Sequence, residues 1–342
     1  MFGQKEKTQV ICIGSISLDL FFPTNEGIII ETPEDVTSQR KLAFELGGKI
    51  SAPELHEAVG GVAANVSQGL AQLGISAACY SCIGNDSNGE FCLQALKKNG
   101  VNTQYVNVLP DARTDLSAII VTPSGERTII HNRDANKRLH VEPGNLTTPW
   151  VLMSSLNGEW QKNMEAVLQA QNTSSKNFSL VLNPGQHNIK EDPRLILQVI
   201  RFTDLLVLNK DEALEIVLHR TPNCEPSELE NEIYLLKTLF QAGAKIIALT
   251  DGIRGAWVYN GVDFWFLQTP KDAHVVDSTG AGDAFMSGFF GALIMNRSLD
   301  ECLRFGMANS QSVIKYYGGS AGLLTLSEIE KIILHLIPQK LS

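Results

Sequence analysis

The chain alternates short apolar stretches, which are typical of buried strands, with amphipathic stretches, which are typical of helices. The first kind includes VICIGSI (10–16), AACYSCIG (77–84) and DLLVLN (204–209). The second kind includes VAANVSQGLAQLG (62–74) and NGEFCLQALKKNG (88–100), and each of these ends on a glycine suited to a helix terminus. Continuous apolar strands between helices indicate a sheet that is buried on both faces. We therefore expect an α/β fold with a mostly parallel sheet and ligands at the carboxyl ends of its strands.

Two segments interrupt this alternation. Residues 23–59 form a long, partly polar insertion. Residues 112–132 contain RTDLSAIIVTPSGERTIIH, whose alternating pattern turns at PSG (123–125), as in a β-hairpin. We expect both segments to form a small β lid outside the main sheet, with surface loops as the alternative. No repeat or linker divides the chain, so we expect one domain over residues 1–342.

The charge balance argues against two classes of partner. The 342 residues include 28 Lys and Arg against 37 Asp and Glu, a formal net charge of −9. Nucleic acids and anionic membranes attract basic surfaces, so neither is expected as the main partner. A small anionic ligand remains compatible with this charge, because a site can be locally positive on an acidic protein.

The cysteines and the N-terminus predict a cytoplasmic protein. Six cysteines are scattered through apolar contexts, which suggests free thiols in a reducing compartment. Cys79 and Cys82 form a lone CYSC, and two small side chains in a buried strand explain it better than a redox pair or half a zinc site. The N-terminal apolar run is interrupted by polar residues, so we expect a first strand there and neither a signal peptide nor a membrane span.

The stretch VVDSTGAGDAF (275–285) combines small residues with a carboxylate at an expected helix start. A helix N-terminus exposes unpaired N–H donors and carries about half a positive charge. Gly280, Ala281 and Gly282 would let an anion approach these donors closely. Such a hole suits a phosphoryl group in transfer, and Asp283 beside it could accept the proton of an attacking hydroxyl. The alternative is an ordinary junction in which Asp283 caps its helix, and this stretch alone leaves both open.

The longer stretch DSTGAGDAFMSGF resembles the C-terminal signature of the ribokinase-like (PfkB) carbohydrate kinase family. GGVAANVSQGLAQLG (60–74) resembles the companion N-terminal motif, and shorter elements stand between and around them in family order, among them GSISLD (14–19) and GERTII (125–130). The resemblance covers nearly the whole chain. It implies a Rossmann-like three-layer sandwich with a small β-strand lid, and transfer of the γ-phosphoryl group of ATP to a hydroxymethyl group.

Position by position, the resemblance also implies roles for individual residues. Asp283 corresponds to the catalytic base, and the three small residues before it correspond to the anion hole. The positions that hold substrate hydroxyls correspond to Asp19, Gly60, Gly61 and Asn65. Each of these has a plainer explanation as well: a surface turn for Asp19, a tight turn for the two glycines, and a polar helix face for Asn65.

The nucleotide and metal positions follow from the same resemblance. Asn209 and Glu212 match an element that helps to hold Mg²⁺, although an N-cap with a capping box explains them equally well. The nucleotide-binding positions correspond to Thr250, Gly252 and Asn309, whereas Asp277 and Thr279 resemble a monovalent-cation site and so suggest K⁺.

Several departures from ribokinase itself bear on the substrate. Val62 stands where ribokinase has Lys, Ser17 stands where it has Asn, and YYGGSAGLL (316–324) differs from the usual cation loop. These changes put ribose in doubt and weaken the K⁺ assignment. We expect a kinase for a small ribose- or fructose-like sugar. The alternatives are a nucleoside kinase of the same family and a catalytically silent ligand sensor or scaffold. Some relatives dimerise through their lid strands, so a homodimer is expected by resemblance.

Overall fold

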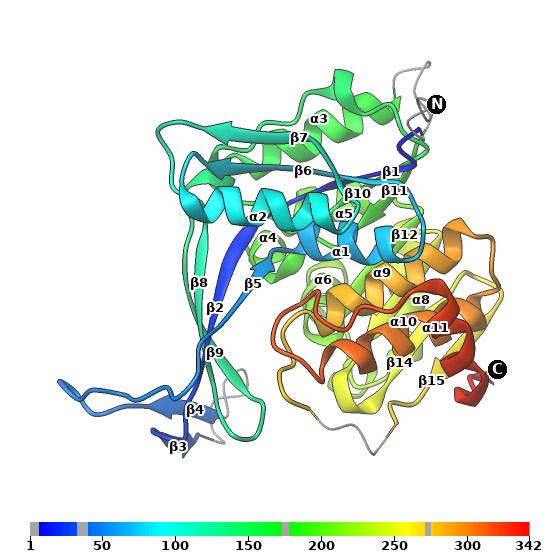
Figure 1. The fold of residues 1–342 in the computed structure, drawn as a ribbon. Coiled ribbons are helices and arrows are strands. Elements are labelled where there is room, and N and C mark those ends of the chain that lie inside the picture. The colour runs from blue at the N-terminus through cyan, green and yellow to red at the C-terminus, as the bar shows by residue number, and fades with distance from the viewer. Residues whose placement is uncertain (1–6, 33–39, 173–177, 271–274, 342) are drawn as a thin grey trace.

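The computed structural model describes residues 7–32, 40–172, 178–270 and 275–341. A ten-stranded sheet forms the centre of this part of the molecule (Figure 1). Seven neighbouring strands run parallel, in the order β7 (Asn102–Leu109), β6 (Ala77–Gly84), β1 (Val10–Ile13), β10 (Trp150–Met153), β11 (Ser179–Leu182), β12 (Leu205–Asn209) and β13 (Ile246–Thr250). The sheet then continues antiparallel through β14 (Ala256–Tyr259), β15 (Phe264–Leu267) and β16 (Gln339–Leu341).

Helices cover both faces of this sheet, as the alternation in the sequence predicts. One face packs against α1 (Val62–Gln72), α2 (Ser87–Lys98), α9 (Ala281–Ile294), α10 (Leu299–Val313) and α11 (Leu326–Ile332). The other packs against α3 (Trp160–Asn172), α4 (Gly185–Glu191), α5 (Pro193–Ile200), α6 (Lys210–Arg220) and α8 (Glu232–Ala242). The short helix α7 (Pro226–Leu229) precedes α8. The α/β three-layer sandwich is therefore confirmed.

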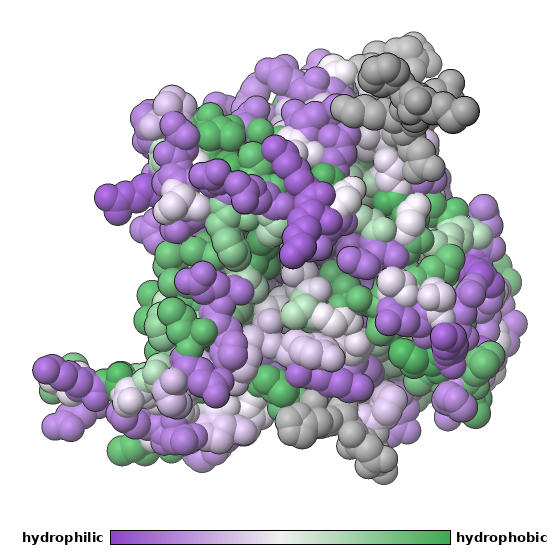
Figure 2. Space-filling model, in the orientation of Figure 1, coloured by the Kyte–Doolittle hydropathy of each residue, from purple (hydrophilic) through white to green (hydrophobic). Residues whose placement is uncertain are grey.

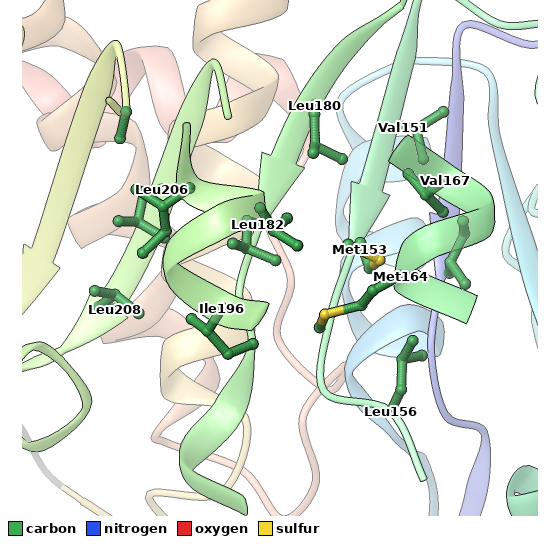
Figure 3. Close-up of a cluster of buried hydrophobic side chains, with 14 of the residues drawn as sticks. Val151, Met153, Leu156, Met164, Val167, Leu180, Leu182, Ile196, Leu206 and Leu208 are labelled. Carbon is green, nitrogen blue, oxygen red and sulfur yellow. The ribbon is translucent and has the colours of Figure 1, made fainter. Parts of the chain in front are cut away.

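Each central strand divides its side chains between two hydrophobic cores. In β1, Ile11 and Ile13 belong to one core, whereas Val10 and Cys12 belong to the other. Figure 3 shows the first core, where Val151 and Met153 of β10 lie beside Val167 and Met164 of α3. Because successive side chains of a strand point to opposite faces, a sheet covered on both sides needs the continuous apolar runs seen in the sequence.

The same geometry settles the role of the CYSC motif. Cys79 and Cys82 lie three residues apart in β6, so their side chains enter opposite cores. Burial raises the pKa of Cys79 to about 12 and that of Cys82 to about 11. Both thiols are free. They are two small buried side chains of a strand, as expected, and they form no redox pair.

A second sheet forms the lid. Its strands lie in the order β5 (His56–Gly60), β2 (Ser17–Pro23), β8 (Leu116–Val121) and β9 (Arg127–Asn132). Figure 1 shows them leaving the body and running down to a separate hairpin of β3 (Ile28–Glu31) and β4 (Arg40–Ala43). The expected hairpin over 112–132 is present as β8 and β9. The insertion over 23–59 contributes β3, β4 and β5, and its residues 33–39 lie outside the described part.

The lid begins earlier than the sequence pattern suggests. Residues 10–16 read as one strand, but β1 ends at Ile13 and the chain enters the lid sheet as β2 at Ser17. Gly14 lies at the crossing, where a Cβ atom would come within 1.9 Å of Ser154 Oγ. Asp19 is consequently a buried residue of a lid strand, and the surface-turn explanation for it is wrong. Within the described residues, no helix is long and apolar enough to cross a membrane.

Candidate active site

The candidate site lies where the carboxyl ends of the parallel strands face the lid. β12 ends at Asn209 and β13 ends at Thr250, and the two residues are paired across the sheet. The first turns of α1 and α9 meet at the same edge, and β2 and β5 of the lid lie next to α1. Open parallel sheets place their ligands at this edge.

Asp283 and Asn65 are in direct contact although they lie far apart in the sequence. Asn65 Nδ2 donates a hydrogen bond of 2.8 Å to Asp283 Oδ2. One helical turn further along, a Cβ atom on Gly69 would come within 2.2 Å of Ser287 Oγ. Glycine at position 69 therefore lets α1 and α9 approach closely, and this approach brings the amide and the carboxyl together.

The surroundings of Asp283 favour its protonated form. Burial is the main cause, and the carboxylate of Asp19 adds to it, whereas the hydrogen bond from Asn65 and the charge of Arg127 oppose it. The balance raises the pKa of Asp283 to about 6. A carboxylate with this pKa is ionised at neutral pH and is a stronger base than an ordinary aspartate.

Asp19 is held against the backbone of the neighbouring lid strand. Ser17 Oγ donates a hydrogen bond of 2.9 Å to Asp19 Oδ1. A Cβ atom on Gly60 would come within 1.9 Å of Asp19 Oδ2, so any larger residue at position 60 would displace the carboxylate. Burial raises the pKa of Asp19, while hydrogen bonds from Ser117 and Ser17 and the charge of Arg133 lower it. Gly61 has φ +96° and starts α1 close to the Ser15 carbonyl, so it is required for the backbone turn.

The glycines before Asp283 serve two different purposes. Gly280 has φ +74°, and a Cβ atom there would come within 2.2 Å of Gly319 Cα, so it lets two loops pack together. A Cβ atom on Gly282 would meet nothing within 4 Å, which means that open space lies in front of the first turn of α9. No side chain caps this helix. The open, uncapped terminus can accept an anion.

Ala281 and Gly282 line a cavity of about 110 Å³. Thr250 and Gly252 line it. Asn309 does not. Its side chain is fully buried. It donates a hydrogen bond of 3.0 Å to Ser287 Oγ and accepts one of 2.9 Å from the Leu324 backbone N–H. The geometry therefore gives Asn309 the task of tying α10 to α9 and to the 320s loop.

The cavity is lined instead by neighbours of Asn309 that the sequence did not single out, namely Met307, Ser310 and Gln311. They surround Asn309 on α10, and the helical repeat turns their side chains the other way. Among the described residues of α10, Met307, Ser310 and Gln311 therefore face this cavity, and Asn309 faces the packed interior.

Asn209 and Glu212 form a capping box at the start of α6. Asn209 Oδ1 accepts a hydrogen bond of 2.9 Å from the Glu212 N–H, and Glu212 Oε2 accepts one of 3.0 Å from the Asn209 N–H. Burial, together with the charges of Asp211 and Asp283, raises the pKa of Glu212 to about 7 despite the hydrogen bond from Asn209. No ion pair to Glu212 is found among the described residues.

Asp277 and Thr279 are engaged with each other. Asp277 Oδ1 accepts hydrogen bonds from the Thr279 N–H (2.9 Å) and hydroxyl (2.7 Å), and Asp277 Oδ2 accepts 3.3 Å from the Gly318 N–H. These contacts fasten the loop before α9 to residues 318–319. In the described ranges, no group of three or more His, Cys, Asp or Glu side chains is placed to hold a metal ion.

One site residue was missed by sequence reasoning. Arg127, at the start of β9, contacts Ser278 Oγ, and its charge acts on both Asp277 and Asp283. Burial lowers its pKa, and the two carboxylates oppose this effect. The stretch GERTII (125–130) contains Arg127 and belonged to the family resemblance, so the signal was present.

Comparison with known proteins gives a consistent result. The family described as "pfkB family carbohydrate kinase" matches residues 7–326. The ATP-dependent 6-phosphofructokinase of Thermoanaerobacterium thermosaccharolyticum is 31% identical over 290 residues, which cover 80% of this chain and 84% of that protein.

Two solved structures have the same fold. The nucleoside kinase of Burkholderia thailandensis, in complex with inosine, superimposes with a TM-score of 0.76 at 19% identity and covers 95% of this chain and 97% of its own. The ribokinase of Cryptococcus neoformans, in complex with ADP, superimposes with a TM-score of 0.74 at 22% identity and covers 95% of this chain and 99% of its own.

Proposed function

Because the chain belongs to the pfkB family of carbohydrate kinases, a phosphotransferase family with alcohol acceptors, we propose that it transfers the γ-phosphoryl group of ATP to a hydroxymethyl group of a small ribose- or fructose-like sugar. The observation that carries the proposal is the position of Asp283. Its carboxyl contacts Asn65 of α1, the helix that follows lid strand β5, and its neighbour Gly282 lines the cavity that Thr250 and Gly252 also line. A base between an acceptor site and a nucleotide site is what phosphoryl transfer requires.

In the proposed reaction, Asp283 accepts the proton of the acceptor hydroxyl as its oxygen attacks the γ-phosphorus. The bond from that phosphorus to the β,γ-bridging oxygen breaks, and ADP leaves. The backbone N–H groups at the start of α9 stabilise the charge on the phosphoryl oxygens, and Arg127 adds a positive charge from the lid. Thr250 and Gly252 would lie beside the nucleotide.

Asp19 and Asn65 would hold the hydroxyl groups of the sugar. Among the described residues, Asn65 Oδ1 is buried without a hydrogen-bond partner. A buried polar atom of this kind costs free energy unless it is satisfied, and a substrate hydroxyl would satisfy it. Gly60 and Gly61 support the arrangement from the backbone.

The central test replaces the proposed base. Asp283→Asn keeps the size of the side chain but cannot accept the proton, so turnover should fall by at least about 100-fold while ATP binding persists. The variant should unfold at no lower temperature than the native protein near neutral pH, since an aspartate with a raised pKa costs stability when ionised. A coupled assay with a panel of sugars and nucleosides measures turnover, and retained turnover in Asp283→Asn would refute the proposal. A nucleoside as the best acceptor would favour the alternative function.

We also propose that Mg²⁺ is held near Glu212 and Asn209. The buried carboxylate of Glu212 is a hard oxygen ligand without an ion-pair partner in the described part, so its chemistry fits this cation. The ion would neutralise charge on the phosphates of ATP. Glu212→Gln should keep the capping box, because Gln also serves at this position, and so should unfold at no lower temperature than the native protein. It should raise the Mg²⁺ concentration needed for half-maximal turnover by about tenfold or more. An unchanged Mg²⁺ dependence would assign Glu212 to the cap alone.

The residues predicted to bind K⁺ fit that ion less well. All the contacts of the Asp277 carboxylate described above are with N–H or hydroxyl donors, two from Thr279 of its own loop and one from Gly318. We therefore treat Asp277 and Thr279 as a fastening of the loop, and equal turnover in K⁺ and in a K⁺-free buffer is the corresponding expectation.

The remaining expectations concern the protein as a whole. We propose one kinase domain, a cytoplasmic location and a homodimer formed through the lid. Exposed isoleucines on the lid support the dimer, because Ile28, Ile30 and Ile130 are 70%, 45% and 62% exposed. Figure 2 shows hydrophobic and hydrophilic surface side by side on the projecting lid at lower left.

A further inference from the structure

The loop between β13 and β14 forms one wall of the cavity of about 110 Å³ beside the proposed nucleotide site. Thr250, Gly252, Gly255 and Ala256 contribute to that wall. Gly252 and Gly255 have φ angles of +46° and +126°, which residues with a side chain rarely adopt. Neither glycine has a side chain that could hold the loop, so the conformation of the loop depends on contacts made by other residues.

Two charged residues hold this loop from the side of α8. Arg254 contacts the Asp251 carboxylate, and Arg254 Nη1 lies 3.1 Å from Oε1 of Glu232, the first residue of α8. On the cavity side, Thr269 Oγ1 donates a hydrogen bond of 2.7 Å to the Gly252 carbonyl. The glycines of the loop therefore lie on the cavity, while its charged residues reach α8.

Glu232 also connects the loop to the end of the neighbouring strand. Lys210, which directly follows β12, donates a hydrogen bond of 2.7 Å from Nζ to the same Oε1 atom of Glu232. Lys210 Nζ also lies 4.0 Å from Asp251 Oδ2. We name Lys210, Glu232, Asp251 and Arg254 the charge network. Glu232 is the member that binds both cations, so it links the ends of β12 and β13 through α8.

The charge network is shielded enough from water to hold its geometry. The side chains of Lys210 and Glu232 are 13% and 17% exposed, whereas that of Arg254 is 50% exposed. Salt bridges between fully exposed side chains contribute little, because water and ions screen them, but shielded pairs are screened less. Burial alone raises the pKa of Glu232, but the hydrogen bond from Lys210, a backbone N–H and the charges of Lys210 and Arg254 outweigh burial and lower this pKa. Glu232 is therefore an ionised partner for both cations at neutral pH.

We propose that Glu232 is a positioning residue for the nucleotide. Through Arg254 and Lys210 it holds the loop from Thr250 to Gly255 in the conformation that binds ATP, without touching ATP itself. This inference rests on the proposed kinase function and adds to it a residue on α8 that lies outside all the motifs quoted above.

The test removes the charge of Glu232 in the full-length protein. Glu232→Gln keeps the size of the side chain but weakens its hold on both cations, so the Kd for ADP should rise by about fivefold or more, measured by calorimetry without acceptor. The KM for ATP should rise with it. The KM for the acceptor, and kcat at saturating ATP, should stay within about twofold, because the loop lines the nucleotide cavity.

A matched control lies at the opposite ends of the same two strands. Asp204 precedes β12, Lys245 precedes β13, and Lys245 Nζ lies 2.7 Å from Asp204 Oδ1. The Asp204 side chain is 17% exposed, as is that of Glu232. Lys245→Gln therefore removes a comparable ion pair between β12 and β13, far along the strands from the loop, and should leave the Kd for ADP unchanged.

A second variant tests whether Glu232 acts through Arg254. Arg254→Gln changes a half-exposed side chain, so it should fold even if Glu232→Gln does not, and it should also raise the Kd for ADP. Combining the two substitutions should raise the Kd by less than the product of the single effects, because both break the same ion pair.

The outcomes separate this inference from the proposed function. Unchanged ADP affinity in Glu232→Gln and Arg254→Gln, or an equal loss in Lys245→Gln, would overturn the positioning role and leave the kinase proposal intact. Single effects that multiply fully in the double variant would overturn it as well. A native protein that binds ADP with the expected changes but phosphorylates no acceptor would support the positioning role and refute the kinase proposal. A native protein that binds no nucleotide would overturn both.

Discussion

Asp283 must lose its proton before it can act as a base, so its pKa sets the acid limit of activity. Burial raises that pKa to about 6, and hence kcat/KM should fall as the pH drops through about 6 and level off above about 7. The hydrogen bond from Asn65 lowers the pKa of Asp283. Asn65→Ala should therefore move the acid limb to higher pH, in addition to raising KM. The pH profile of kcat/KM measures both effects.

A useful control for this profile is Ser17→Ala. Ser17 bonds Asp19 and does not contact Asp283, so its removal should leave the midpoint of the acid limb almost unchanged. A limb that stays fixed in Asn65→Ala would mean that the ionisation of Asp283 does not limit the reaction. A limb that moves to lower pH would show that Asn65 destabilises the carboxylate.

Two glycines at the start of α9 offer a matched pair of substitutions. Gly282→Ala places its methyl group in open space, so the helix should remain as stable or gain stability, while the methyl obstructs the anion hole. Turnover should fall by about tenfold or more at an unchanged unfolding temperature. Gly280→Ala meets Gly319 Cα at 2.2 Å in a left-handed conformation, so it should lower the unfolding temperature. Thermal unfolding and steady-state kinetics of both variants provide the check.

Unchanged turnover in Gly282→Ala would refute the proposed anion hole at the start of α9. If Gly282→Ala were fully active, no anion would need to approach this helix terminus. The comparison is informative because the two positions lie two residues apart, yet only Gly280 has a positive φ and a close backbone neighbour.

The helices and strands that could be predicted from the sequence are those whose pattern of apolar and polar residues lies within the segment itself. The apolar run of β6 and the amphipathic pattern of α1 each follow from a repeat within the segment. The change of sheet at Gly14 could not be predicted, since it depends on Ser154, 140 residues away, and both flanking strands are apolar. The antiparallel direction of β14 to β16 could not be predicted from composition either, because the direction of a strand depends on how it is connected to its neighbours.

The candidate site shows the same division. Asp283, Gly282 and Asn65 could be proposed from two motifs, and the structure brings them together. The role of Arg127 depends on Ser278, which lies 151 residues further along the chain. The cavity that Arg127 lines is assembled from four separate stretches of the chain (29, 40–42, 122–129 and 278), so no single stretch of sequence contains its pattern.

For the whole molecule, the exposed isoleucines of the lid predict self-association. Sedimentation velocity at micromolar concentration should show a dimer, and Ile28→Thr combined with Ile30→Thr should yield a monomer. Threonine keeps the preference for a strand while removing apolar surface, so the hairpin should persist. A native protein that sediments as a monomer would refute the lid dimer, and the activity of the double variant would then be unaffected.

The pairing of β16 with β15 has a practical consequence for handling this protein. Phe264, Trp265 and Phe266 of β15 pair with Leu341, Lys340 and Gln339, and the Lys340 ammonium lies 5.5 Å from the centre of the Trp265 ring. Removing β16 would leave β15, an aromatic strand, as an unpaired edge of the sheet, and unpaired edge strands promote aggregation.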